Sequence, residues 1–524
     1  MSTPGTRVPQ LPPAPHPPAA RPATAAARLR AAAVPLLPAA AMSLAGLHGL
    51  TARGPWRDEV ATYQAAQRDL PQLWDLLRHV DAVHGLYYLL MHAVFRLFGA
   101  GEATLRLPSV AAMAVAAAGV ALIGRRLAGP AVGLTAGLLL AVTPFASRYA
   151  QEGRSYALVT AGVVLSGLLL LRACERPTAR RWAGYGAAVL LVGLLHAFAL
   201  LVLPAHGAAL LLPRRPRTSR RVRLGWLAAA AAAALGALPL LLYSSGQAAQ
   251  VDWLPPVTAR TPPALLTDFA GPRPAVLAVV TALAVLGLAR PAPRPGGGGP
   301  LSLRALALPW LLLPPALLMA ASSVTPLYYD RYVLYSLPGL VLSAAAGLDT
   351  AARTACRLLS RQAVRTPRPT AVAAALGLLL AAGVLAAQLP VQHRERTARA
   401  RADDFRAAAR LVGQGARPGD AVVFAPANRR GIEDVYPQDF RDTVDALLTV
   451  SPAASGTLAG REAATGRIGP LLRRHDRVWL VRGRGRYAVV GARDQEVLRV
   501  LAADYLPIAD SAVRGFAVQL WTRR

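Results

Sequence analysis

The stretch LYYLLMHAVFRLF, residues 86–98, decides how this chain crosses a membrane. It is apolar, but it is only about thirteen residues long and contains His92 and Arg96. A helix needs about 20 residues to cross roughly 30 Å of hydrocarbon. If this stretch spans the bilayer, every later segment changes sides, so the charges elsewhere in the chain must distinguish the two topologies.

The composition is that of an integral membrane protein. Of the 524 residues, 54% are apolar and 16% are charged, and the mean hydropathy is +0.36, which excludes a disordered or fibrous protein and argues against a soluble enzyme. The first long apolar run lacks a convincing signal-peptide cleavage site, so we expect an uncleaved span. About eleven spans are predicted, at 31–50, 106–124, 130–147, 155–172, 182–196, 198–212, 224–243, 274–290, 305–321, 336–352 and 370–389.

The basic residues indicate the orientation of these spans. All 58 are arginine, and they cluster at 125–126, 172–181, 214–223, 290–304 and 353–368. If residues 86–98 lie on the membrane surface, every cluster falls on the side of the basic N-terminus, as the positive-inside rule requires. We therefore predict an interfacial helix there, a cytoplasmic N-terminus and an extracellular C-terminal region.

The acidic residues and cysteines restrict the chemistry. Only twelve of the 27 acidic residues precede residue 390, and ten of these lie on the outer face in this topology, so chemistry is expected there. Carboxylates within the spans, which usually mark ion-coupled transport, are nearly absent. Cys174 and Cys356 are too few and too far apart for a disulfide framework or a thiolate metal site.

Composition divides the chain into three parts. Residues 1–30 are rich in Pro, Ala and Arg and predict a disordered cytoplasmic tail. Residues 31–389 form the membrane domain, with 51–105 as its first outer loop. Residues 390–524 have mixed charge. They show a helical pattern at 403–412 and predict short strands at 421–424, 478–481 and 515–521. The predicted fold is an α-helical polytopic membrane protein with a small extracellular α/β domain at the C-terminus.

The first outer loop carries the first candidate catalytic residues. Asp58 and Glu59 follow the first span, and Asp81 and His84 precede the interfacial stretch. A carboxylate at the membrane surface, partly shielded from water, can act as a general base. The alternative is structural, because a carboxylate also stabilises the start of a helix, and a histidine among aromatic residues is commonly a packing residue.

Two later segments place an acid, arginine and tyrosine at the outer end of a span. They are SRYAQEGRSY, residues 147–156, and TPLYYDRYVLYSLPG, residues 325–339. The guanidinium fork suits a phosphate group. These arginines are predicted to lie on the outer face, whereas the arginine clusters of the chain are predicted to lie on the inner face. Arg154 and Arg331 are therefore candidate phosphate ligands, although arginines reaching outer headgroups would give the same pattern.

An ordered series of phrases resembles a known family. The acidic pair is followed by His84-Gly85-Leu86-Tyr87-Tyr88, LFGAGEATLRLPS, RRLAG and RYAQEGRSYAL, with a weaker echo at 329–332. This series, covering about residues 50–170, resembles the GT-C glycosyltransferases of the protein O-mannosyltransferase and aminoarabinose transferase type, families 39 and 83. The family usually has His-Pro-Pro-Leu-Tyr-Tyr where this chain has Val83-His84-Gly85-Leu86-Tyr87-Tyr88.

The resemblance implies transfer of a sugar from a polyprenyl phosphate, on the outer face and with inversion. Asp58 matches the first-loop acid of the family and is expected to act as the base, with Glu59 and Asp81 supporting it or orienting the acceptor. The remaining expected site residues are the phosphate ligands Arg154, Arg331 and His84 and the supporting residues Glu152, Tyr156, Tyr329 and Asp330.

The expected partners are the lipid-linked donor, membrane lipids and an acceptor glycan, lipid or protein. No cofactor is expected, since the resembled subfamilies are not generally taken to need a metal, although Asp58, Asp81 and Glu152 could supply oxygen ligands to one. Mannose is the first expectation for the sugar, with arabinose, galactose and glucose open. A lipid or glycan transporter and a non-catalytic scaffold remain alternatives, and nucleic-acid binding is disfavoured because the arginines are scattered among short loops.

Overall fold

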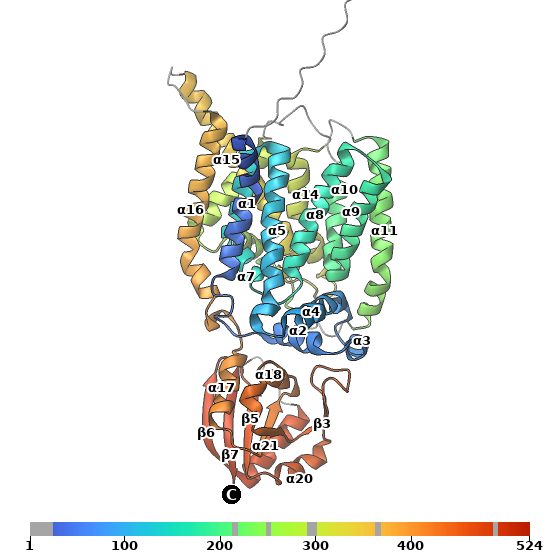
Figure 1. The fold of residues 1–524 in the computed structure, drawn as a ribbon, viewed down its shortest axis with the longest axis vertical. Helices are drawn as coiled ribbons and strands as arrows, with labels where there is room; N and C mark the ends of the chain where they lie inside the picture. Colours follow the sequence, from blue (N-terminus) through green and yellow to red (C-terminus); the bar gives the residue numbers. More distant parts are fainter. Residues whose placement is uncertain (1–24, 212–217, 248–252, 291–300, 362–367, 486–490) are drawn as a thin grey trace, which may run out of the picture.

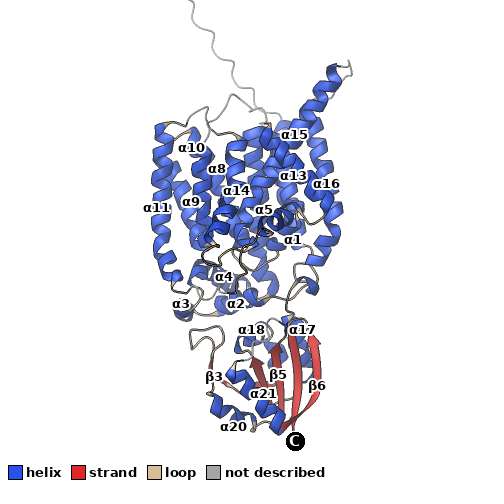
Figure 2. Ribbon diagram, turned by 180° about the vertical axis from the view of Figure 1, so that it is seen from behind, coloured by secondary structure: helices blue, strands red, loops and turns tan. Residues whose placement is uncertain are grey.

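The computed structural model describes residues 25–211, 218–247, 253–290, 301–361, 368–485 and 491–524. Most of the predicted tail, residues 1–24, lies outside these ranges, and residues 25–30, predicted to be disordered, are instead the first residues of a helix. The chain forms a bundle of long helices with a small sheet domain at one end (Figure 1). Figure 2, from behind, shows that the strands labelled in the picture are confined to that domain. The predicted α-helical polytopic fold with a small C-terminal α/β domain is confirmed.

Among the residues that the structure describes, seven segments are long and apolar enough to cross a membrane. They contain α1 (Ala25–Leu47), α5 (Glu102–Ala128), α8 (Tyr156–Glu175), α11 (Arg220–Ser245), α14 (Leu303–Ala321), α15 (Leu337–Arg361) and α16 (Pro369–Glu395). The segment with α15 also includes the 3₁₀ helix η4 (Asp330–Ser336).

Two bent helix pairs raise the number of candidate spans to nine. The first pair is α6 (Pro130–Val142) with α7 (Pro144–Ala150), and the second is α12 (Thr261–Ala270) with α13 (Pro274–Ala289). Proline ends a helix because it lacks an N–H donor, which explains the 67° bend of the first pair at Pro144. In the second pair, bent by 94°, Gly271 adopts a φ of +111° that favours glycine.

The predicted count of eleven spans is not confirmed. The two further segments correspond to α9 (Ala179–Leu195), with 17 residues, and to η2 (Ala197–Leu201) with α10 (Val202–Leu211). Both are apolar but shorter than the seven long segments. The region thus consists of a pair of short helices that interrupts the series of full-length spans.

The first outer loop folds into short helices at the base of the bundle (Figure 1). They are α2 (Arg57–Gln67), α3 (Leu70–His79), η1 (Ala82–His84) and α4 (Gly85–Phe98). The segment containing α4 is too short to count as a span, in agreement with the predicted interfacial helix. In α3, Leu73 and Leu76 are buried while Trp74 is 67% exposed, so this helix presents an aromatic side chain outward at the end of the bundle.

The opposite end of the bundle carries basic residues. Arg125 of α5 donates a hydrogen bond to the carbonyl of Ala31, and Arg126 pairs with Glu175 at the end of α8. The sheet domain and the helices of the first loop share the other end (Figure 1). The described part of the chain thus has the relative placement that the arginine pattern predicts. Which end faces outward is still a prediction.

The C-terminal domain contains a five-stranded sheet of order β2-β1-β5-β7-β6. Strands β2, β1 and β5 are parallel, and β7 is antiparallel to both β5 and β6. The strands of this sheet are β1 (Asp420–Ala425), β2 (Thr443–Asp445), β5 (Arg477–Gly483), β6 (Tyr505–Val513) and β7 (Phe516–Arg523). A second sheet pairs β3 (Leu448–Val450) with β4 (Arg461–Glu462). Every residue of β1 is buried, as expected for a central strand.

The linker after α16 contains η5 (Ala398–Ala400). The helices of the domain are α17 (Phe405–Gly415), η6 (Ala427–Arg430), α18 (Gly431–Val435), α19 (Pro437–Phe440), η7 (Thr465–Arg467), α20 (Ile468–Leu472) and α21 (Ala492–Asp504). The predicted helix and three predicted strands correspond to α17, β1, β5 and β7. The domain is therefore of the α/β type that composition indicated.

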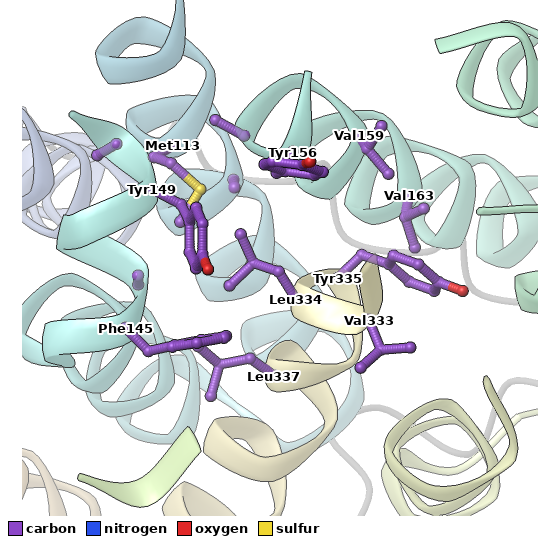
Figure 3. Close-up of a cluster of buried hydrophobic side chains, with 14 of the residues drawn as sticks. Met113, Phe145, Tyr149, Tyr156, Val159, Val163, Val333, Leu334, Tyr335 and Leu337 are labelled. Carbon is purple, nitrogen blue, oxygen red and sulfur yellow. The ribbon is translucent and has the colours of Figure 1, made fainter. Parts of the chain in front are cut away.

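A buried cluster in the bundle fixes the position of η4. Leu334 of η4 points toward Tyr149, and Leu337 at the start of α15 points toward Phe145 (Figure 3). The rings of Phe145 and Tyr149 are 5.0 Å apart, and those of Tyr149 and Tyr156 are 5.7 Å apart. This packing places the first residues of η4 beside the start of α8.

Candidate functional site

Asp58 lies in the first turn of α2, at the base of the bundle. Its side chain is 16% exposed, so it is shielded but still accessible. Its Oδ2 atom is 3.3 Å from an Arg331 Nη atom, and its Oδ1 atom is 3.8 Å from the Nε atom of Arg57. The structure thus brings together an acid of the first loop and an arginine from the distant 325–339 segment.

Arg154 joins three elements of the same site. It lies in the turn between α7 and α8 and is 5% exposed. One Nη atom donates to the Asp58 carbonyl at 3.3 Å and to Thr62 Oγ1 and Tyr88 Oη at 3.2 Å. The other Nη atom is 2.6 Å from His84 Nε2. Arg154 therefore fixes α2, η1 and α4 around one guanidinium group.

His84 is neutral in this arrangement. Burial and the positive charge of Arg154 lower the pKa of His84 well below its ordinary value. Because arginine has no acceptor, His84 Nε2 must accept the hydrogen bond from Arg154, and the proton of the neutral ring resides on Nδ1. His84 thus offers Nδ1–H as a donor and carries no charge of its own.

Asp81 lies behind Tyr88 in the same network. Its Oδ2 atom accepts a hydrogen bond of 2.8 Å from Tyr88 Oη, and its backbone is in the left-handed region with φ of 57°. Burial raises the pKa of Asp81, while the charge of Arg154 acts in the opposite direction. Asp81 therefore contacts the site through Tyr88.

Glu59 has both carboxylate oxygens engaged. Its side chain is fully buried and accepts two hydrogen bonds of 2.8 Å from Arg106 and one of 2.8 Å from the Gly153 N–H. Burial acts to raise the pKa of Glu59, but the charge and hydrogen bonds of Arg106 prevail and lower it to about 2. Glu59 is thus an ionised anchor that ties α2 to α5 and to the turn holding Arg154.

Glu152 pairs with an arginine from the C-terminal linker. Its Oε2 atom is 2.9 Å from an Arg401 Nη atom, and the two side chains are 1% and 5% exposed. Its Oε1 atom is buried and has no hydrogen-bond partner in the part of the chain that the structure describes. Glu152 therefore connects the RYAQEGRSYAL segment to the residues that follow α16.

Arg331 is surrounded by aromatic rings. Its guanidinium carbon lies 4.2 Å from the ring centroid of Tyr329, 5.1 Å from that of Trp56 and 5.7 Å from that of Tyr156. Ring faces attract a cation, so these contacts hold the guanidinium in place. Asp330 instead accepts a 2.6 Å hydrogen bond from the Arg331 backbone N–H, which stabilises the start of η4.

The site contains buried donors that nothing in the described ranges satisfies. A buried donor without an acceptor is costly, so such atoms indicate where a ligand or water binds. Neutral His84 contributes one of them and arginines contribute three. The set comprises Nε of Arg154, Arg331 and Arg401, Nε1 of Trp56 and Nδ1 of His84. Their chemistry suits an anion rich in oxygen acceptors.

The predicted residues thus fall into two groups. Asp58 and the predicted phosphate ligands lie together, with Tyr156 and Tyr329 against Arg331 and with Asp81 reaching the network through Tyr88. Glu59, Glu152 and Asp330 instead hold neighbouring elements in place. Among the described residues, no group of three or more His, Cys, Asp or Glu could hold a metal ion.

The contacting residues that were not identified from the sequence include Trp56, Thr62, Arg106 and Arg401. Trp56 lies two residues before Asp58, and Arg106 lies inside the quoted phrase LFGAGEATLRLPS, so these neighbourhoods carry a local signal for both residues. Thr62 lies one helical turn after Asp58, on the same face of α2. Arg401 is one of many arginines after the last span, and no local signal distinguishes it.

Comparisons with known proteins agree with this architecture. Residues 86–243 match the model of the dolichyl-phosphate-mannose-protein mannosyltransferase family, a segment running from α4 to α11. No curated protein sequence matches the chain. Because the family match covers less than half of the chain, the solved structures provide the broader comparison.

Three solved structures have a similar fold. ArnT from Cupriavidus metallidurans bound to undecaprenyl phosphate is 13% identical, with a TM-score of 0.54 over 92% of this chain and 97% of that one. The apo state of that protein is also 13% identical, with a TM-score of 0.56 over 94% of this chain and 98% of that one. Arabinofuranosyltransferase AftD from Mycobacteria is 15% identical, with a TM-score of 0.50 over 95% of this chain and 40% of its own. At these identities the likeness concerns the fold, and the resemblance to GT-C glycosyltransferases is confirmed.

Proposed function

We propose that this multi-pass membrane protein, which has the GT-C glycosyltransferase fold, transfers a sugar from a polyprenyl phosphate to an acceptor hydroxyl. The observation that carries the proposal is the placement of Asp58 beside the buried cations Arg154 and Arg331. One group can take a proton while the other two stabilise a phosphate. Support also comes from ArnT, the structural neighbour that binds undecaprenyl phosphate.

The reaction is a single displacement. Asp58 takes the proton of the acceptor hydroxyl as its oxygen forms a bond to the anomeric carbon of the sugar. The bond from that carbon to the phosphate oxygen breaks, and its electron pair stays on the phosphate. Attack opposite to the leaving group inverts the anomeric configuration. The leaving phosphate needs no general acid, because its charge is stabilised by cations already in place.

The proposed phosphate site uses the free donors around Asp58. Arg154 and Arg331 supply charge and unsatisfied Nε–H groups, and neutral His84 supplies Nδ1–H. Hydrogen bonds from charged donors to an anion are about twice as strong as neutral ones. These guanidinium groups can neutralise the phosphate, so the proposal requires no metal. Glu59 supports the site by holding α2.

The acceptor is a glycan, lipid or protein of the cell envelope, and the reaction takes place on the outer face. Two features of the sequence support the outer face: most acidic residues before residue 390 lie there in the predicted topology, and the arginine clusters lie on the opposite face. Mannose is the first choice of sugar, in line with the description of the matched family model. Arabinose, galactose and glucose are the donors to compare with it.

The test uses purified full-length protein in lipid nanodiscs with polyprenyl-phosphate mannose, arabinose, galactose or glucose. We expect binding of at least one donor and release of polyprenyl phosphate, with an inverted anomeric configuration in any transferred product. If the protein neither binds nor cleaves any of these donors, the proposal is overturned in favour of a scaffold. Movement of an intact donor across a proteoliposome membrane, without cleavage, would favour a transporter.

A further inference from the structure

The linker between α16 and α17 passes directly beside the proposed site. Arg401, just after η5, is 6% exposed and pairs with Glu152 at 2.9 Å. Its guanidinium carbon lies 5.0 Å from the ring centroid of Trp56. The guanidinium carbon of Arg331 lies 5.1 Å from the same ring. One indole thus contacts a cation of the linker and a cation of the proposed phosphate site.

Arg401 neutralises a carboxylate that the surrounding arginines do not pair with in the described structure. Arg106 is committed to Glu59 through two hydrogen bonds. Arg53 donates to the carbonyls of Gln151 and Glu395 rather than to a carboxylate. A buried charge that loses its partner is strongly destabilising, so removal of Arg401 would leave Glu152 to attract other nearby cations.

The C-terminal domain, which follows this linker in the chain, contacts α2. Gln64 donates to Asp434 Oδ2 at 2.6 Å and to the Leu458 carbonyl at 3.1 Å. The approach is close at Gly431, where an added Cβ would lie 2.6 Å from a methyl carbon of Val60. Asp58 lies in the first turn of helix α2, so the same helix carries the proposed base and contacts the domain.

We propose that Arg401 is a positioning residue: by neutralising Glu152 and supporting Trp56, it holds Arg331 beside Asp58, so that the C-terminal domain completes the donor site. This inference rests on the proposed glycosyl transfer. Arg401 acts through Trp56 and Glu152, whereas Arg331 and Arg154 contact the donor phosphate. The domain is then a part of the transferase site in addition to any role in acceptor selection.

The test compares full-length Arg401→Gln and Arg401→Lys with the unaltered protein. We expect Arg401→Gln to raise the KM for the lipid donor roughly 10- to 100-fold, with a smaller effect on kcat, because a displaced Arg331 makes weaker charge-assisted hydrogen bonds to the donor phosphate. Arg401→Lys retains the charge beside Glu152 and should recover most of this loss. Arg441→Gln, whose side chain is 78% exposed in the same domain, is the matched control and should behave like the unaltered protein.

A second pair of variants tests the mechanism. Glu152→Gln in the Arg401→Gln background removes the unpaired charge, so the double variant should bind the donor more tightly than Arg401→Gln alone. If the effects of the two substitutions on donor binding are strictly additive, the proposed neutralisation of Glu152 by Arg401 is overturned. An unchanged donor KM in Arg401→Gln would overturn the positioning role.

Binding of undecaprenyl phosphate alone separates this inference from the proposed function. If the unaltered protein neither binds this lipid nor cleaves any donor, the proposed function fails. If it does both and Arg401→Gln matches it, only the positioning role fails. If Arg401→Gln does not fold, Arg401→Lys and the double variant carry the comparison. A donor KM of the double variant close to that of Arg401→Lys supports the neutralisation of Glu152, and a donor KM of the double variant roughly 10- to 100-fold above that of Arg401→Lys overturns it.

Discussion

The carboxylate of Asp58 lies 3.3 Å from the guanidinium group of Arg331, although 273 positions separate them in the chain. This ion pair joins the first loop to the segment before α15. The pair therefore places the proposed base directly beside one of the two arginines proposed to bind the phosphate.

Asp58→Asn should lower kcat by roughly 10² to 10⁴ while leaving donor binding intact, because the amide cannot take the acceptor proton. The measurement is turnover together with equilibrium binding of polyprenyl phosphate in nanodiscs. Asp476→Asn, whose carboxylate is 85% exposed in the C-terminal domain, serves as the control. Full activity of Asp58→Asn would rule out Asp58 as the base.

Arg331→Gln should weaken donor binding by about 10- to 100-fold, since a hydrogen bond to a charged group contributes about 1.5–3 kcal/mol. The loss should appear mainly in the KM for the lipid donor. Arg96→Gln, on the exposed face of α4, is the control, and it should bind the donor normally. Unchanged lipid affinity in Arg331→Gln would remove this residue from the phosphate site.

The membrane architecture could largely be predicted from the sequence, because apolar length and arginine placement are local properties. The stretch 86–98 was too short to span, and α4 is indeed a short helix at the end of the bundle. The predicted count of eleven spans is not confirmed. Residues 179–211 form a pair of short helices, and Pro144 and Gly271 break two other segments, which a hydropathy average does not resolve.

The candidate site could be predicted only where its residues stand in recognisable phrases. Asp58, Arg154 and Arg331 were identified because acids and outer arginines stand out locally, and the structure places them together. The engagement of Glu59 with Arg106 depends on the packing of α2 against α5, which the sequence does not encode in any spacing. The same is true of Arg401, whose partner Glu152 is 249 positions away.

The orientation of the protein can be tested by cysteine labelling in intact cells. The native Cys174 and Cys356 are buried and would be replaced by alanine. Ala179→Cys lies exposed at the start of α9, and Ala503→Cys lies exposed on α21 of the C-terminal domain. We expect an impermeant maleimide to label position 503 and to leave 179 unlabelled until the cells are permeabilised. The reverse pattern would place the C-terminal domain in the cytoplasm.

Glu59→Gln should destabilise the protein and change its response to acid. Removing one partner of a buried ion pair costs about 3–5 kcal/mol, because Arg106 is left buried without its counter-charge. The pKa of Glu59 falls from its ordinary value of 4.5 to about 2 in the folded state, so the folded state binds fewer protons than the unfolded state between these values. The contribution of Glu59 is thus fully present above pH 4.5 and is lost as the pH falls toward 2.

Thermal unfolding in detergent between pH 7 and pH 3 measures both effects. The unaltered protein should lose stability below about pH 4.5, and Glu59→Gln should start from a lower Tm and show a shallower decline, since the titrating group is gone. Asp476→Asn should follow the unaltered protein because its carboxylate is exposed. An acid-side decline in Glu59→Gln as steep as in the unaltered protein would show that the Glu59–Arg106 pair does not anchor α2 to α5.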